Sequence, residues 1–167
     1  SLHIPHTGRG ESKRLTEVNL SDCRLGPAST TELAKVFSDA DATMINSLAI
    51  GSNPIGDKAM FQLLHGLKDV SLTSLDISKT DCGVSTASKL AELLGEDSKF
   101  KAVLTSVNCL KNPLGDEGLA TLVTAIETSS VGSICGLSEG QTTVNWSNQN
   151  LGPFDCKIIA ADCAGGG

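Results

Sequence analysis

Histidine and cysteine are the first residue types to consider in this 167-residue chain as nucleophiles, general bases or metal ligands. Two of the three histidines, His3 and His6, fall within the first ten residues. The third, His65, comes near the end of an expected helix, where an imidazole faces solvent and interacts favourably with the helix dipole. No serine or cysteine lies at a spacing that would pair it with His65 for nucleophilic catalysis. We therefore expect no catalytic residues and no enzyme activity.

The six cysteines do not have the spacing of a metal site. The sequence contains no C-x-x-C pair or cysteine–histidine cluster typical of zinc, so we expect neither a metal nor a cofactor. Cys82 and Cys109 take inward positions in the apolar pattern described below, and a buried reduced cysteine behaves as a small hydrophobic residue. Cys156 and Cys163 are seven residues apart, on one face of an expected last helix. Free, mostly buried thiols favour a reducing intracellular compartment, the cytoplasm.

The charge of the chain argues against two kinds of partner. The net charge is −6, and residues 1–14 are basic, which leaves ten basic and eighteen acidic residues in the remainder. An acidic body repels a phosphate backbone, so we expect no nucleic acid. No apolar run approaches the ~20 residues of a membrane-spanning helix, and the first ten residues lack the apolar core of a signal peptide. We expect a soluble protein without membrane insertion.

The apolar residues recur five times with the spacing L-x-x-L-x-L-x-x-N-x-L-G, and successive final glycines are 27 to 37 residues apart. Self-similarity at such a period is typical of repeat architectures, whose units bury their apolar faces only against one another. The copies are Leu15, Val18, Leu20, Leu25, Gly26; Ile45, Leu48, Ile50, Ile55, Gly56; Leu72, Leu75, Ile77, Cys82, Gly83; Leu104, Val107, Cys109, Leu114, Gly115; and a degenerate Val144, Trp146, Leu151, Gly152.

Each copy predicts a strand followed by a helix. Apolar residues at positions 1, 4 and 6 with small polar residues between them indicate a strand with one buried face. Apolar residues three and four apart then indicate a helix, and we expect Asp57 and Asp116 to cap two of the helices. Because each strand returns through a helix, the strands should form one parallel sheet. The predicted strands are 15–22, 45–51, 72–78, 104–110 and 142–147.

The segments "LTSLDISKTDCG" and "LTSVNCLKNPLGDEGLATLVTAI" match position by position, and over residues 15 to 163 the chain resembles the ribonuclease-inhibitor-like branch of the leucine-rich-repeat family. The resemblance implies an α/β fold: a right-handed solenoid of about five repeats, a horseshoe segment with a concave parallel sheet and convex helices. It makes residues 1–14 an N-terminal extension and residues 15–167 the repeat domain. In this family the column that contains Asn53 and Asn112 hydrogen-bonds the backbone of neighbouring turns.

Two regions leave alternatives open. Residues 128–141 include "SSVGSICG", which breaks the pattern and admits another register starting at Ile134 and Leu137, so this stretch is either an irregular strand entry or a surface excursion. Trp146 takes an inward position, which favours a place in the core. The last helix carries Ile158 and Ile159 without a polar cap, which we interpret as an end that further repeats or a neighbouring subunit would cover.

The outward strand positions form our candidate partner-binding surface. The resemblance implies a noncatalytic module or scaffold that binds protein partners through this concave face and its ends; the alternatives are a structural subunit of a large assembly or a regulator of a nuclease or a small GTPase. Arginine and aromatic residues, which usually dominate tight interfaces, are absent from these positions. Three interpretations stay open: the face binds a polar partner with modest affinity, the ends of the module make the contacts, or the hydroxyl groups have a structural role in the sheet. The candidates are Thr16, Glu17, Asn19, Asn46, Ser47, Thr73, Ser74, Asp76, Thr105, Ser106, Asn108, Thr142, Thr143 and Asn145.

Overall fold

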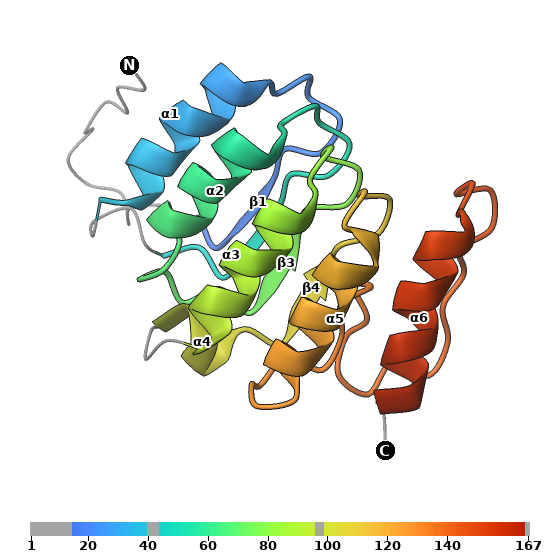
Figure 1. Cartoon of the computed structure of the whole chain (residues 1–167). Coiled ribbons are helices and arrows are strands. Elements are labelled where there is room, and N and C mark those ends of the chain that lie inside the picture. The colour runs from blue at the N-terminus through green and yellow to red at the C-terminus, as the bar shows by residue number, and fades with distance from the viewer. Residues whose placement is uncertain (1–14, 40–43, 96–98, 166–167) are drawn as a thin grey trace.

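A computed structural model describes residues 15–39, 44–95 and 99–165 (Figure 1). The predicted extension, residues 1–14, lies outside the described residues. In chain order the elements of the described ranges are β1 (Glu17–Asn19), α1 (Pro27–Phe37), β2 (Ser47–Ala49), α2 (Asp57–Gly66), β3 (Ser74–Asp76), α3 (Val84–Gly95), α4 (Lys99–Val103), β4 (Ser106–Asn108), α5 (Gly115–Ile126) and α6 (Pro153–Gly165). We call the strand, turn and helix of each copy of the spacing a unit, numbered one to five.

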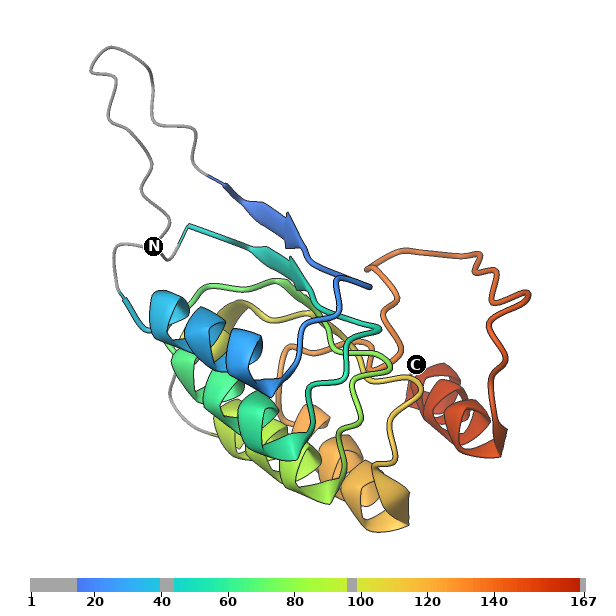
Figure 2. The same cartoon turned by 90° about the horizontal axis from the view of Figure 1, so that it is seen from above.

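The four strands form one parallel sheet in chain order, β1-β2-β3-β4. Their central residues lie directly opposite one another, with Val18 beside Leu48, Leu48 beside Leu75 and Leu75 beside Val107. Figure 2 shows α1, α2, α3 and α5 in a row on one side of this sheet. The prediction of an α/β fold with parallel strands is confirmed for the first four units, and the arrangement is compatible with a leucine-rich-repeat fold.

The inward consensus positions build the core between the sheet and the helices. Leu48 and Leu75 are each 1% exposed and pack in one cluster with apolar residues of the helices such as Leu63 and Leu90. The cluster thins in the first unit, where Leu15 is 67% exposed and Val18 is only half-buried. Burial of this apolar surface, rather than helix propensity, is what stabilises short strands and helices of this kind.

The predicted fifth strand, 142–147, is wrong. These residues form no strand, and residues 131–136, which we call the edge segment, lie against β4 instead. The carbonyl of Ser133 accepts the Val107 N–H at 2.9 Å, and the carbonyl of Ile134 accepts the Cys109 N–H at 3.0 Å. Ile134, where the alternative register begins, is buried, so the edge segment satisfies the donors of β4 and adds apolar contacts to the core.

The fifth unit nevertheless keeps the turn and the helix of the pattern. At the equivalent turn position all five units have a left-handed residue with φ between 50° and 61°: Asp22, Ser52, Lys79, Lys111 and Asn148. Trp146 is half-buried beside the core rather than within it. The expectation that both isoleucines of α6 lack cover is wrong for Ile158, which is fully buried in the core, while Ile159 is half-buried.

Candidate protein-interaction surface

The pairing of β1 to β4 aligns the predicted partner-binding side chains in rows across the sheet. Glu17, Ser47, Ser74 and Ser106 lie opposite one another in turn, and so do Asn19, Ala49, Asp76 and Asn108. We call the candidates of the first four units the strand face. Its members are Thr16, Glu17, Asn19, Asn46, Ser47, Thr73, Ser74, Asp76, Thr105, Ser106 and Asn108.

Three predicted residues do not join this surface. Thr142, Thr143 and Asn145 are exposed but lie outside the sheet, because the edge segment occupies the position their strand was expected to take. Figure 2 shows this part of the chain leaving the sheet and arching away before it enters α6. The strand face therefore ends at β4 instead of continuing into a fifth row. Ser106, also predicted to face a partner, is only 8% exposed because the edge segment pairs beside it.

Two threonines of the strand face, Thr73 and Thr105, bond the backbone of the sheet. Thr73 Oγ1 donates to the carbonyl of Asn46 at 2.9 Å, and Thr105 Oγ1 donates to the carbonyl of Thr73 at 3.0 Å. Each hydroxyl therefore bonds the backbone of the preceding unit just before the strand begins. This structural use is the alternative that the sequence left open for the hydroxyl columns.

The amide and carboxylate side chains at the strand ends also bond nearby backbone. The Oδ1 atoms of Asn19, Asp76 and Asn108 accept the backbone N–H two residues further on, at 3.0, 2.9 and 3.1 Å. Such Asx turns mimic a backbone turn and direct the chain away from the strand. Asn145 makes the same contact with Ser147 at 2.9 Å. Asn or Asp directly before a turn was the sequence signal for this role.

The side chains left to face a partner are short or acidic. Glu17 is exposed, and Asn46, Ser47 and Ser74 make no side-chain hydrogen bond within the described residues. With the carboxylates of Glu17 and Asp76, the strand face is negative. It suits close approach of a polar or basic partner surface, whereas it lacks the aromatic and arginine anchors of tight interfaces.

The turns beyond the strands are held by two buried asparagines. Asn53 Oδ1 accepts the N–H groups of Cys23 and Leu25 at 3.0 and 2.9 Å, in the unit before its own. Asn112 Oδ1 accepts those of Thr80 and Cys82 at 3.0 and 3.1 Å. The structural role implied for this column by the family resemblance is confirmed at both positions.

Asp57 has a different role from the predicted one. It does not cap its own helix: its Oδ1 accepts the N–H of Gly83 at 2.8 Å and the hydroxyl of Thr86 at 2.6 Å, at the start of α3. Asp116, also predicted to be a cap, instead pairs with Lys157 of α6 at 2.9 Å. Both carboxylates therefore link neighbouring units, which sequence reasoning missed because their partners are distant in the chain.

A hollow of about 500 Å³ opens where the edge segment meets α6. Thr105, Ser133, Glu139 and Asp162 are among the residues that line it. Asp162 accepts hydrogen bonds from Ser133 Oγ at 2.7 Å, from the Ile134 N–H at 2.9 Å and from Cys135 Sγ at 2.7 Å. The lining is polar and acidic, and the Asp162 carboxylate in it already accepts these three hydrogen bonds. The only sequence signal for it was the break in the repeat pattern.

All six cysteines are free, but only three are buried: Cys82, Cys109 and Cys135. Burial, followed by the hydrogen bond to Asp162 and its charge, raises the pKa of the Cys135 thiol to about 12. Burial likewise raises the pKa of Cys82 and of Cys109. The expectation that the cysteines are mostly buried is wrong for the other three, since Cys23, Cys156 and Cys163 are exposed.

The other surfaces of the described ranges show no constellation for chemistry. His65 is exposed in the last turn of α2, as predicted. Histidine, cysteine, aspartate and glutamate side chains nowhere gather into a group of three that could hold a metal ion within those ranges. None of the helices described there combines the length and the apolar character needed to cross a membrane.

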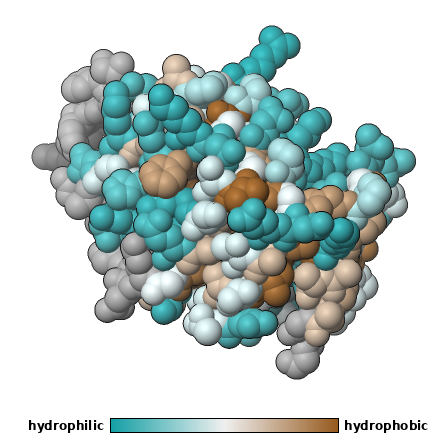
Figure 3. All heavy atoms as spheres, viewed as in Figure 1, coloured by the Kyte–Doolittle hydropathy of each residue, from teal (hydrophilic) through white to brown (hydrophobic). Residues whose placement is uncertain are grey.

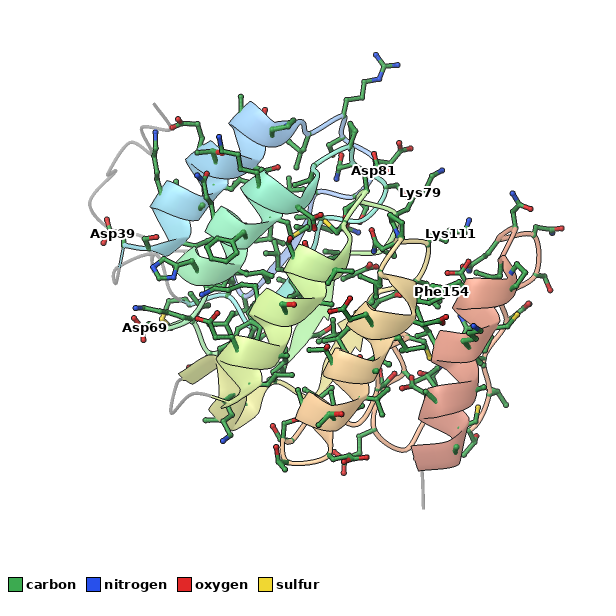
Figure 4. The ribbon with its side chains drawn as sticks, viewed as in Figure 1. Asp39, Asp69, Lys79, Asp81, Lys111 and Phe154 are labelled. Atoms are coloured by element: carbon green, nitrogen blue, oxygen red, sulfur yellow. The ribbon has the colours of Figure 1, made fainter. Side chains whose placement is uncertain are left out.

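The helix-covered side and the turn edge are mixed in character. Figure 3 shows a largely hydrophilic surface with hydrophobic residues gathered toward α5 and α6, where Leu119, Val123 and Ile159 are half-buried. Figure 4 shows Lys79, Asp81 and Lys111 on neighbouring turns at one end of the units, with Asp39 and Asp69 at the other and Phe154 at the start of α6.

The class of protein that this arrangement fits is a strand–turn–helix repeat protein with a polar sheet face. A matching protein is "NACHT, LRR and PYD domains-containing protein 5" of Bos taurus, which is 28% identical over 151 residues. The match covers 89% of this chain and 12% of that protein, so the chain spans about an eighth of the length of the curated relative it matches. No family model matches the chain.

Proposed function

We propose that the chain is a noncatalytic protein-interaction module, a right-handed leucine-rich-repeat solenoid segment that binds a protein partner through its strand face. The observation that carries the proposal is the similarity over 89% of the chain to a protein whose name includes leucine-rich repeats. The aligned rows of short polar side chains support it, because a parallel sheet backed by helices offers an extended and rigid surface.

The proposed partner presents a polar or basic surface. Glu17 and Asp76 give the strand face negative charge. Ser47 lies opposite Glu17 and Ala49 lies opposite Asp76, and these short side chains leave room for a longer side chain from a partner. The acidic balance of the chain makes nucleic acid a poor partner. Six free thiols favour an intracellular, cytoplasmic setting.

The test compares serine-to-arginine substitutions on opposite sides of the module. Ser47→Arg and Ser74→Arg add bulk and positive charge to the strand face at side chains that bond no described residue. Ser88→Arg makes the same change at an exposed position of α3. Proteins that the unaltered chain captures from its native source are identified by mass spectrometry and then measured against each variant.

We expect the two strand-face variants to lose the specific partner and Ser88→Arg to keep it, with far-ultraviolet circular dichroism unchanged in all three. Retention of the partner by Ser47→Arg and Ser74→Arg together with its loss in Ser88→Arg would place the contact on the helices. That outcome would overturn the proposed binding face.

A further inference from the structure

We propose that the edge segment, residues 131–136, and the segment of the fifth unit, residues 142–147, are alternative occupants of the free edge of β4. Exchanging one for the other would add a fifth strand to the sheet and release the edge segment. The inference concerns a conformational change within this chain, and it stands independently of the proposed partner binding.

In the first three units, the donors at the sheet edge bond the next unit in one regular way. Leu20, Ile50 and Ile77 donate to the carbonyls of Ala49, Asp76 and Asn108. Two residues further along each turn, the backbone repeats this pattern. The N–H groups of Asp22, Ser52 and Lys79 donate to the carbonyls of Gly51, Ser78 and Leu110. The same pattern applied to the fourth unit would use the carbonyls of Asn145 and Ser147.

The fourth unit finds substitutes for both bonds. Cys109 donates to the carbonyl of Ile134 at 3.0 Å, and Lys111 donates to Asp155 Oδ1 of α6 at 2.6 Å. The edge segment does not pair as a regular strand, because it forms a parallel bridge at Ser106 and an antiparallel bridge at Asn108. It then leaves the sheet through Gly136, which has a φ of 87°. A Cβ there would lie 3.0 Å from that of Asn108, so only glycine fits.

The segment 142–147 is already shaped for the position it does not occupy. Its turn has the left-handed Asn148 and the Asx contact of Asn145 found in the paired units. Within the described part of the chain, the backbone N–H groups of residues 142–146 donate to no other residue. Val144 is 45% exposed, whereas Val107 at the same position of the fourth unit is 3% exposed.

The register of the exchanged state follows from the pairing of β3 with β4. Val144 would lie opposite Val107 and Asn145 opposite Asn108, as Leu75 and Asp76 pair in the unit before. The Thr142 hydroxyl would reach the carbonyl of Thr105, as Thr105 reaches that of Thr73. That carbonyl now accepts the Gly132 N–H at 2.8 Å, so the two segments compete for the same atom.

Asp162 holds the present arrangement. Its carboxylate accepts hydrogen bonds from three consecutive residues of the edge segment, Ser133, Ile134 and Cys135. It binds nothing on residues 142–147 among the described contacts. Removing these bonds weakens the edge segment without touching its competitor, and so favours the exchange.

The experiment measures amide hydrogen exchange in Asp162→Ala and in Asp162→Asn, which keeps one acceptor oxygen. Glu139→Ala removes a carboxylate from the wall of the same hollow and serves as the control. In the unaltered chain and the control we expect residues 142–146 to exchange as unprotected amides. In Asp162→Ala we expect their exchange to slow by about tenfold or more while residues 132–136 exchange faster, with a smaller shift in Asp162→Asn.

A disulfide trap checks the register. Ser106→Cys with Thr143→Cys places two thiols opposite each other only after the exchange, and we expect mass spectrometry to find that disulfide enriched in the Asp162→Ala background. Ser74→Cys with Thr143→Cys, one strand further away, should not link. Faster exchange of residues 132–136 with residues 142–146 still unprotected, or no 106–143 disulfide, would mean that the edge segment frays without replacement and would overturn the proposal. If Asp162→Ala does not fold, Asp162→Asn decides by the same two measurements.

Discussion

Replacing Asn112 with alanine removes the side chain that completes the turn of the third unit. Asn112 is 4% exposed. Its Oδ1 accepts the N–H groups of Thr80 and Cys82, and its Nδ2 donates to the carbonyls of Ile77 and Cys109 at 2.8 and 3.2 Å. Among the described contacts, the two N–H groups have no other acceptor, whereas the Ile77 carbonyl also accepts the Thr80 hydroxyl at 2.7 Å.

The cost follows from how deeply these partners are buried. A buried N–H left without an acceptor costs about 1–3 kcal/mol, and Thr80 and Cys82 are both fully buried. Two such groups lower the free energy of unfolding by about 4 kcal/mol, against a typical total of about 5–15 kcal/mol. Asn53→Ala is the matched comparison, because Asn53 accepts two N–H groups in the same geometry.

The partners of Asn53 differ in exposure. Cys23 is exposed and Leu25 is half-buried, so water can replace the lost acceptor. We expect Asn53→Ala to cost only about 1–2 kcal/mol. Both free energies are measured by urea unfolding with linear extrapolation, with amide exchange of Thr80 and Cys82 as the local readout. Equal losses, or a larger loss for Asn53→Ala, would refute the account in which burial of the partners sets the cost.

Three further outcomes are expected. Alkylation at pH 8 should modify three thiols in the folded chain and six in denaturant, because the buried thiols are protonated and enclosed. Folding raises the pKa of Cys135 from 9.0 to about 12, so the folded state binds that proton more tightly than the unfolded state. The free energy of unfolding, measured by urea titration, should therefore fall as the pH rises from 9 toward 12. Asp57→Ala should lower stability by about 1–2 kcal/mol and speed amide exchange at Gly83 rather than in α2, whereas Asp116→Ala should cost less than about 1 kcal/mol, because its pair with Lys157 is exposed.

Most of the fold could be predicted from the sequence because the signal is local. In each of the first four units the apolar positions alternate in the strand and recur three and four apart in the helix, and burial of those faces requires the parallel order found. The helix start at Pro27 also follows from its own residue type, since proline needs no donor there.

The fifth strand could not be predicted because two segments fit one edge. Val144 satisfies the spacing, while Ile134 does so in another register, and neither is excluded locally. Asp155 bonds the turn that follows β4 and Asp162 bonds the edge segment, and both aspartates lie in the following helix. Contacts of such sequence separation leave no mark in the apolar pattern.

The candidate surface was predicted in position but not in chemistry. The alternation placed the side chains of Thr73 and Asn108 on the outward face, as found. It did not reveal that both bond nearby backbone, because a hydroxyl or amide that binds a partner and one that completes a turn have the same residue type. Burial and partner atoms distinguish them: Thr73 bonds the preceding unit, and Asn108 bonds the turn of its own unit.

The side-chain links between units run in opposite directions, which bears on how the chain responds to force. Asn53 reaches back to the first unit and Asn112 back to the third, while Asp57 of the second unit reaches forward to the third. The third unit is therefore hydrogen-bonded by side chains of both the second and the fourth unit. The first unit is bonded in this way only by the second, and its core contains fewer buried residues. When the chain is pulled by its ends, the first unit should unfold at low force. The second to fourth units should then unfold together, in one large extension step.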